Sequence, residues 1–344
     1  MEHFAAIDVS LEASSLCVVD GKGTIIREVK AASEPQSLAA ALAGLPGPLV
    51  RVGLEAGPLS QWLHAGLTGL GLPVVCLETR HLAATLRAMP NKTDRNDARG
   101  MAQAVRTGWF RQVHVKSLPA QEARALLAAR QLLVRQVKDV GLSLRGLLRN
   151  FGLKLGAVGK AGLAARVREL LAGSPRLLAI AESLLAAHAA LSCEVAVLHR
   201  RVLATARNDE VCRRLMTAPG VGPVVALAFK SAIDDPDRFA RSRAVGAHFG
   251  LTPRRWQSGE VDRAGHITRA GDAMLRTLLY EAATVLLTRT PRWSSLKAWG
   301  VRLAERQGSK RARVGIARKL AVILHRMWRD GSAFNWGEPA AAPT

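Results

Sequence analysis

The chain has 344 residues, of which 49% are apolar, and it carries a formal net charge of +22 at neutral pH. This length allows two or three domains with a full hydrophobic core. The composition fits a soluble globular protein, and the sequence has no run of eighteen uncharged apolar residues that would span a membrane. The large positive charge, with an isoelectric point near 11.2, predicts a polyanionic partner, above all a nucleic acid.

The charge is distributed unevenly along the chain. Residues 1–117 hold 12 basic and 10 acidic residues, a balance of +2. Residues 118–204 hold 13 and 5, a balance of +8, and residues 205–344 hold 24 and 12, a balance of +12. We therefore expect a nearly neutral N-terminal domain, and we expect the rest of the chain to carry the basic surface.

The cysteines are spread widely, at Cys17, Cys76, Cys193 and Cys212. They form no C-x-x-C pair and have no histidine partners at the spacing of a zinc site. We predict that they are buried thiols in a reducing compartment. The opening Met1-Glu2-His3 lacks the basic and apolar regions of a signal peptide, which favours a cytoplasmic protein.

Hydrophobic patterning in residues 1–117 predicts short strands and helices. Strands are expected at 4–9, 16–19, 24–29, 49–54 and 73–77, and helices at 38–42, 59–70, 79–88 and 94–104. Asp20-Gly21-Lys22-Gly23 lies between two β-rich runs and predicts a hairpin turn. The order of elements indicates a mixed sheet covered by helices, which is an α/β domain.

Four acidic residues of this domain fall where a site can form. Asp8 interrupts the first apolar strand, and Glu55 stands directly at the end of another. Asp94 and Asp97 are three residues apart in a predicted helix, so their Cβ atoms lie ~5–6 Å apart on one face. Ligands bind at the carboxyl ends of strands in α/β sheets, so the four carboxylates can converge. Such a cluster is what a two-metal phosphoryl-transfer site needs, because hard divalent cations take oxygen ligands.

Each of these acids also has an ordinary structural interpretation. Asp94 as an N-cap, with Asp97 three residues later, resembles a capping box at the start of a helix. Asp8 would be a buried carboxyl held by hydrogen bonds, since an unpaired one is costly in an apolar strand. Glu55 would be a surface acid at a strand end. The residues alone leave both interpretations open.

Residues 118–204 predict a helical coiled-coil arm. Apolar residues recur every three or four positions at Leu133, Val137, Val140, Leu144, Leu147 and Phe151. Glycines interrupt the helix between residues 152 and 162, and the same spacing resumes from Leu184 to Val202. We expect an antiparallel hairpin that folds on itself or pairs with another subunit, giving a homo-oligomer, either a dimer or a tetramer. Its arginines form a solvated face or, given the +8 balance, a contact for nucleic acid.

Residues 205–336 predict a helical C-terminal domain, followed by a disordered tail at 337–344. Gly220 and Gly222 lie in an apolar–Gly–apolar–Gly pattern between two helices, which indicates either a helix-hairpin-helix-like element or a simple Gly/Pro turn. In a helix-hairpin-helix, backbone N–H groups at a helix start approach a phosphate closely. The last helix carries Lys310, Arg311 and Arg313, which we expect to bind nucleic acid.

Ser258 lies in a predicted loop bounded by glycines, with Arg254 and Arg255 before it and Arg263 and Arg269 after it. A single serine in a loop is ordinarily a surface residue, and no nearby side chain is an evident general base for it. The arginines suit contacts with the phosphates of a nucleic acid. The residues of this loop alone do not identify Ser258 as a catalytic group.

Several motifs together carry a resemblance to a known family. The first domain contains Phe4-Ala5-Ala6-Ile7-Asp8-Val9-Ser10, Gly53-Leu54-Glu55-Ala56 and Lys92-Thr93-Asp94-x-x-Asp97-Ala98. The C-terminal domain contains Gly250-Leu251-Thr252-Pro253-Arg254, Ser258-Gly259 and Ile267-Thr268-x-x-Gly271-Asp272-x-x-Leu275-Arg276. In kind, order and separation these motifs resemble the DEDD transposases of the insertion-sequence one-hundred-ten family, relatives of the pilin-gene invertases.

The resemblance implies a ribonuclease-H/RuvC-like fold for the first domain and a DNA transposase or recombinase activity. The four acidic residues would hold Mg²⁺, and Ser258 would attack the scissile phosphate to form a phosphoserine link to DNA. One branch of that family uses a structured guide RNA, so such an RNA is an expected partner besides DNA. Many members have two serines, two glycines and a basic residue here, whereas this chain has Gln257-Ser258-Gly259-Glu260-Val261-Asp262, with one serine and two additional acids.

Two other functions remain open on the sequence. A structure-selective nuclease of the Holliday-junction type would use the four acids and a water molecule, without a covalent intermediate. A non-enzymatic nucleic-acid-binding protein would keep the acids as caps and buried partners. A covalent protein–DNA adduct separates the transposase from the nuclease, and metal-dependent cleavage separates both from the binding protein. No membrane association is expected for any of the three.

Overall fold

The computed structural model describes residues 1–86 and 93–337 of the chain. It falls into two compact units, which meet in the sequence between Lys116 and Ser117. Each unit has hydrophobic core clusters of its own. Lys92 of the motif around Asp94, and the residues from 338 onward of the tail that we expect to be disordered, lie outside the described residues.

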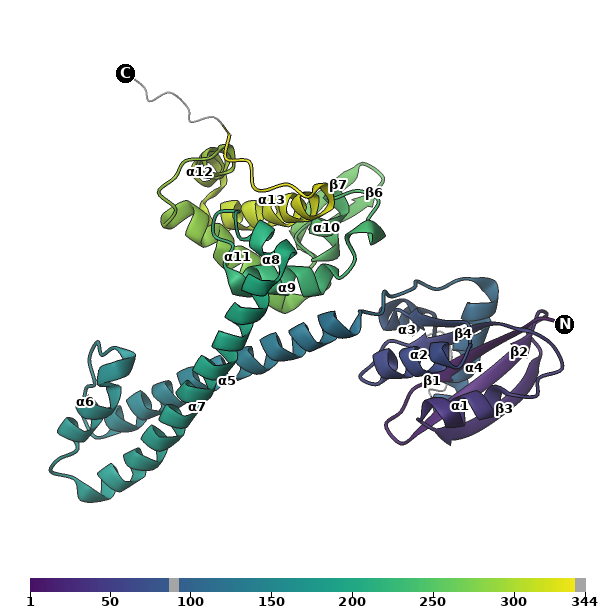
Figure 1. Ribbon diagram of the computed structural model, residues 1–344, viewed down its shortest axis with the longest axis horizontal. Coiled ribbons are helices and arrows are strands. Elements are labelled where there is room, and N and C mark those ends of the chain that lie inside the picture. The colour runs from purple at the N-terminus through teal and green to yellow at the C-terminus, as the bar shows by residue number, and fades with distance from the viewer. Residues whose placement is uncertain (87–92, 338–344) are drawn as a thin grey trace. The chain divides into compact units, whose positions relative to one another are not determined.

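The first unit is built on a mixed five-stranded sheet (Figure 1). Its strands are β1 (His3–Asp8), β2 (Ala13–Asp20), β3 (Ile25–Ala32), β4 (Leu49–Glu55) and β5 (Val74–Leu77), in the spatial order β3-β2-β1-β4-β5. β1, β2 and β3 pair antiparallel, whereas β4 and β5 run parallel to β1. The hairpin turn after β2 forms as predicted, because the Asp20 carboxylate accepts hydrogen bonds from the backbone N–H groups of Lys22 and Thr24.

Helices cover both faces of this sheet. They are α1 (Pro35–Leu42), α2 (Ser60–Gly69), α3 (Thr79–Leu86) and α4 (Asp94–Thr107). Successive residues of a strand point to opposite faces. Ala5 and Ile7 of β1 therefore share a core with α1 and α2, whereas Ala6 shares a core with α3 and α4. The prediction of an α/β domain with a mixed sheet is confirmed.

The second unit begins with the predicted helical arm. Its helices are α5 (Leu118–Asn150), α6 (Leu163–Leu170) and α7 (Pro175–Asn208). α5 and α7 run in opposite directions and lie side by side (Figure 1). Leu144 and Leu148 of α5 share a core with Ala181 and Leu185 of α7 and with residues of α6. Within one chain, the two long helices of the arm form the expected antiparallel hairpin. α7 also continues past the boundary expected at residue 204.

α7 is more apolar than its sequence neighbours. Among the described residues it is one helix that is long and apolar enough, by length and composition, to cross a membrane. In the structure it packs along α5, and Val202 and Ala206 near its end are fully buried in the core of the second unit. Only 11% of the apolar stretch of α7 is buried within the described residues, so packing on α5 leaves most of it exposed. Cys193 on this helix is exposed, which corrects the prediction for one cysteine; Cys17, Cys76 and Cys212 are buried as expected.

The remaining helices of the second unit pack into one large core. They are α8 (Glu210–Leu215), α9 (Pro223–Ile233), α10 (Arg243–His248), α11 (Ala273–Thr288), α12 (Ser295–Gln307) and α13 (Ser309–Asp330). The core includes Phe229 of α9, Phe249 after α10 and Leu320 of α13. His325 of α13 is fully buried, and its ring nitrogens lie 2.9 Å from the Ser242 hydroxyl and the Pro236 carbonyl oxygen. This core holds the segment that carries Ser258.

That segment corrects the prediction of a purely helical C-terminal domain with a serine loop. It forms a two-stranded antiparallel ribbon of β6 (Pro253–Ser258) and β7 (Val261–Ile267). The turn between the strands has only two residues, Gly259 and Glu260, and Gly259 has a φ of +56°, which glycine adopts without strain. All side chains of β6 are exposed, so the strand lacks the apolar alternation by which strands are recognised in a sequence.

Candidate active site

Asp8 and Glu55 end two neighbouring strands of the first unit. β1 and β4 pair in parallel, with Ile7 opposite Leu54, so the last residues of both strands lie at the same edge of the sheet. The two carboxyl groups share a hydrogen bond. Burial of Asp8, the charge of Glu55 and this hydrogen bond, and the charges of Asp94 and Asp97 together raise the pKa of Asp8 to about 7. The structure therefore brings all four predicted acids into one electrostatic neighbourhood.

α4 carries Asp94 and Asp97 to this edge of the sheet because it lies very close to the strands. A Cβ added at Gly53 of β4 would collide with the side chain of Val105 on α4. The absence of a side chain at Gly53 thus allows the close approach of the helix. Ala98 and Met101 complete the apolar face of α4 that packs on the sheet.

The capping interpretation of Asp94 is wrong. Thr93 is the N-cap of α4, and its hydroxyl accepts a hydrogen bond from the backbone N–H of Asn96 at 3.2 Å. Asp94 and Asp97 lie in the first turn, where the helix dipole favours negative charge, but the capping hydrogen bond is made by Thr93. Both carboxylates are therefore left free of a capping role.

The donor set suits a hard divalent cation. The neighbours that shift the pKa of Asp8 are all carboxyl groups, so the cluster concentrates negative charge and oxygen ligands. Within residues 1–86 and 93–337, no three His, Cys, Asp or Glu side chains lie close enough to hold a metal ion as they stand. The fit to a cation thus rests on the chemistry of the four carboxylates and on their common location.

Ser258 lies at the free end of the β6–β7 ribbon in the second unit. Trp256 is paired with Arg263 and Ser258 with Val261. Because side chains alternate along a strand, these four residues share one face of the ribbon. Arg255 lies on the other face, and its guanidinium Nε binds the Asp262 carboxylate at 2.7 Å. Asp262, an acid that departs from the family pattern, therefore neutralises one of the predicted DNA-binding arginines.

The base of the ribbon is held firmly by the helices below it. Gly250 and Gly271 both have positive φ, and a Cβ at either would collide with the backbone of the opposite segment. The Arg276 guanidinium donates hydrogen bonds to the carbonyl oxygens of Phe249, at 3.1 Å, and Ala270, at 2.8 Å. Arg269, with a φ of +56°, is exposed between these anchors. Gly250 and Gly271 thus allow the two segments at the base of the ribbon to pack closely against each other.

The other predicted nucleic-acid contacts lie on the same unit. Gly222 is the N-cap of α9, and a Cβ there would meet no atom within 4 Å, so the turn is open on this side. At Gly220 a glycine is required by packing, because a Cβ there would collide with the backbone carbonyl of Ala282 on α11. In the first turn of α13, Lys310 and Arg311 are exposed, and Arg313 lies half-buried 6.0 Å from the Tyr280 ring.

Two residues near these sites were not found from the sequence. Trp256 is 58% exposed on the face of Ser258, and its ring covers Gly265. The sequence feature that could have pointed to Trp256 is its position as a single aromatic residue among arginines. Glu28 of β3 binds two arginines of α4 that flank Asp97. The signal for Glu28 was the spacing of Arg95 and Arg99, one helical turn apart, which places both on a face that needs an acidic partner.

Two transposase family models match this chain, one in its N-terminal part and one in its C-terminal part. Residues 5–152 match a transposase family model for the DEDD transposases of IS110, and residues 212–298 match the transposase IS116/IS110/IS902 family. These two segments contain the four acids and Ser258.

Individual relatives extend over most of the chain. It is 31% identical over 327 residues to the transposase for insertion sequence element IS1111A of Coxiella burnetii, which covers 92% of this chain and 87% of that protein. A probable family 20 transposase of Pseudomonas aeruginosa is 30% identical over 80% of this chain and 83% of its own length. The transposase for insertion sequence element IS1328 of Yersinia enterocolitica is 27% identical over 83% and 85%. This chain belongs to the IS110 (IS116/IS110/IS902) family of DEDD transposases.

Proposed function

We propose that this transposase cuts and rejoins DNA at the ends and targets of an insertion element, with a metal ion held by carboxylates and a phosphoserine intermediate. The observation that carries this proposal is the common location of Asp8, Glu55, Asp94 and Asp97. The order β3-β2-β1-β4-β5, with three antiparallel strands followed by two parallel ones, supports a ribonuclease-H/RuvC-like fold for the unit that carries them.

The four carboxylates would hold a divalent cation, which we propose to be Mg²⁺. When bound, such a cation polarises a phosphoryl oxygen and makes an attacking oxygen a stronger nucleophile. Asp8 and Glu55 offer oxygens from strand ends, which are rigid supports. Asp94 and Asp97 offer theirs from the first turn of a helix whose cap is supplied by Thr93.

Ser258 is the proposed nucleophile. Its Oγ forms a bond to the scissile phosphorus as the bond from phosphorus to one deoxyribose oxygen breaks. The serine hydroxyl loses its proton to solvent and the leaving oxygen takes one up, so a hydroxyl end is left and no net proton is consumed. Attack by another DNA hydroxyl on the phosphoserine reverses these changes and rejoins the strand, so no external energy source is needed. Arg254 and Arg263 are exposed on the same ribbon and suit the task of offsetting charge on the phosphoryl oxygens.

A structured guide RNA and a second copy of this chain are proposed partners. The family relationship and the basic balance of residues 118–344 support nucleic-acid binding over a large surface.

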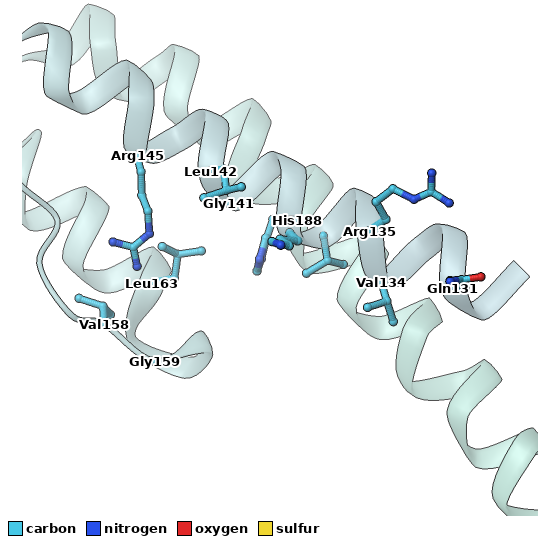
Figure 2. A pocket seen from close by; sticks show the side chains of 12 residues that line it. Gln131, Val134, Arg135, Gly141, Leu142, Arg145, Val158, Gly159, Leu163 and His188 are labelled. Carbon is cyan, nitrogen blue, oxygen red and sulfur yellow. The ribbon is translucent and has the colours of Figure 1, made fainter. Parts of the chain in front are cut away.

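The arm offers a groove of about 550 Å³ between α5, α7 and the segment before α6 (Figure 2). Val134, Leu142 and Leu163 line it, with Arg135 and Arg145 beside them. His188 of α7 also lies in this groove, next to Gly141. This surface suits a coiled-coil contact in a dimer or tetramer.

Removal of divalent metal tests the proposal. The chain is incubated with DNA that carries the element ends, together with RNA transcribed from the element flank, in Mg²⁺ or in excess chelator. We expect strand cleavage in Mg²⁺, none with chelator, and recovery on adding Mg²⁺ back, because the carboxylates alone cannot activate the phosphate. Equal cleavage in chelator would exclude the metal site, and an absence of cleavage in every condition would favour a binding protein.

DNA binding should depend strongly on salt. The candidate contacts, Arg254, Arg263, Arg269, Lys310 and Arg311, are exposed cations of the second unit. If the protein neutralises ~6–10 phosphates, the affinity for DNA should fall by ~10³–10⁵ between 50 and 200 mM salt, because bound counterions are released. Fluorescence anisotropy at a series of salt concentrations measures the slope. A flat response would mean that these residues do not contact the DNA backbone.

A further inference from the structure

Two arginines of α4 form ion pairs with one glutamate of the sheet. The Arg95 guanidinium donates hydrogen bonds to Oε2 of Glu28, from Nε at 3.0 Å and from Nη2 at 2.6 Å. Arg99, one helical turn later, donates to the same oxygen from Nη2 at 2.8 Å and to Oε1 from Nε. Both oxygens of Glu28 are thus occupied by charge-assisted hydrogen bonds from the helix that carries Asp94 and Asp97.

The carboxylate at the centre of this contact is largely shielded from water. The side chain of Glu28 is 15% exposed, whereas that of Arg95 is 66% exposed and that of Arg99 is 36% exposed. The hydrogen bonds from Arg99 and Arg95 lower the pKa of Glu28 to about 2, so it is ionised at neutral pH. A partly buried, bidentate contact of this kind is directional and holds its partners more firmly than a surface ion pair does.

The same side of α4 is tied to the β2–β3 turn further along. Gln103 donates a hydrogen bond to the carbonyl oxygen of Gly23 at 2.7 Å, and Arg106 donates one to that of Gly21 at 3.2 Å. Residues 95, 99, 103 and 106 form a stripe at helical spacing that faces the β2–β3 hairpin. This polar stripe fixes the rotation of α4 about its own axis.

The first turn of α4 depends on this stripe more than the rest of the helix does. The buried apolar residues of α4 begin at Ala98, and the preceding four residues, 94–97, are exposed or half-buried. Packing on the sheet therefore does not fix the turn that carries Asp94 and Asp97. The ion pairs of Arg95 and Arg99 with Glu28 link this part of α4 to β3, which belongs to the same sheet as β1 and β4, the strands that end in Asp8 and Glu55.

We propose that Glu28 is a positioning residue, which sets the placement of Asp94 and Asp97 against Asp8 and Glu55 through Arg95 and Arg99. This inference rests on the proposed metal site. Glu28 also keeps two guanidinium groups engaged on the side of the helix away from the carboxylates. Without Glu28, these cations are free to turn towards the acids and compete with the metal ion.

The test measures metal binding directly in the full-length protein. Mn²⁺ serves as the probe, and electron paramagnetic resonance reports its free and bound forms. The variants are Glu28→Gln, which keeps the size of the side chain and removes its charge, and Arg95→Gln, which removes one of the two partners. Glu34→Gln is the matched control, because Glu34 is an exposed acid of the same unit whose side chain makes no capping hydrogen bond.

Glu28→Gln should raise the Mn²⁺ concentration at half saturation by roughly 10-fold, the lower end of the effect of residues that orient metal ligands. Arg95→Gln should raise it less, because Arg99 still holds Glu28. Glu34→Gln should leave it unchanged. Cleavage by Glu28→Gln should approach that of the unchanged protein at saturating metal, whereas a simple loss of folded protein would lower cleavage at every metal concentration.

Unchanged Mn²⁺ binding by Glu28→Gln would overturn the inference while leaving the metal site intact. If the unchanged protein itself binds no Mn²⁺, the proposed function fails first, and the inference fails with it. If circular dichroism shows that Glu28→Gln is unfolded, Arg95→Gln decides, and normal Mn²⁺ affinity in that variant contradicts the role of the pair.

Discussion

Replacing Asp8 or Asp97 with asparagine should abolish strand cleavage and leave DNA binding intact. Asparagine keeps the shape of the side chain and removes the charge that would hold a divalent cation. A catalytic metal ion stabilises the transition state by several kcal/mol, so cleavage should fall by roughly 10³-fold or more. Single-turnover cleavage of end DNA measures the rate, and anisotropy at the same salt concentration measures binding.

Asp139→Asn is the matched control for these variants, because Asp139 is an exposed acid of α5 outside the first unit. The Asp8 and Asp97 variants should also unfold at no lower temperature than the unchanged protein. Asp8 faces other carboxyl groups, and Thr93 supplies the cap of α4, so neither acid is needed for the fold. Near-normal cleavage by either variant would mean that the replaced residue is not a metal ligand and has only a structural role.

Ser258→Ala should abolish both the covalent protein–DNA adduct and strand rejoining. The alanine variant keeps the exposed β6–β7 ribbon and its arginines, so DNA binding should persist. Ser309→Ala is the matched control, because Ser309 is another exposed serine of the same unit. Cleavage that continues in Ser258→Ala without an adduct would favour the metal-dependent nuclease over the transposase mechanism.

Mixing two inactive variants tests whether subunits share the site. The four acids belong to one unit of the chain and Ser258 to the other. If the site is built between subunits, Ser258→Ala and Asp97→Asn together should recover part of the activity that each lacks. If both groups act within one subunit, the mixture should stay inactive.

The location of the acids could be predicted because it follows from local pattern and sheet topology. Asp8 and Glu55 terminate short apolar runs, and parallel strands bring their carboxyl ends to one edge. The spacing of Asp94 and Asp97 fixed their common face. What the pattern left open was the capping role, since Thr93 and Asp94 are both good N-cap residues. Only the hydrogen bond from Asn96 to Thr93 decides between them.

Features that depend on tertiary contact could not be predicted. Glu28 lies more than sixty residues before its partners Arg95 and Arg99, and nothing in its own strand marks it as special. The β6–β7 ribbon was missed because its side chains are exposed, so the strands carry no apolar alternation. Its one local sign was Gly259 at a position suited to a two-residue hairpin turn.

Identification of the residue that becomes linked to DNA tests the central claim most directly. The unchanged protein is incubated in Mg²⁺ with end DNA that carries a nick next to the scissile phosphate, so that the cleaved fragment diffuses away and the intermediate accumulates. The trapped complex is digested with nuclease and protease, and the modified peptide is analysed by mass spectrometry. The account predicts a nucleotide-bearing phosphoserine at Ser258, formed only in the presence of divalent metal. A modification at any other residue, or cleavage without any modified peptide, would contradict it.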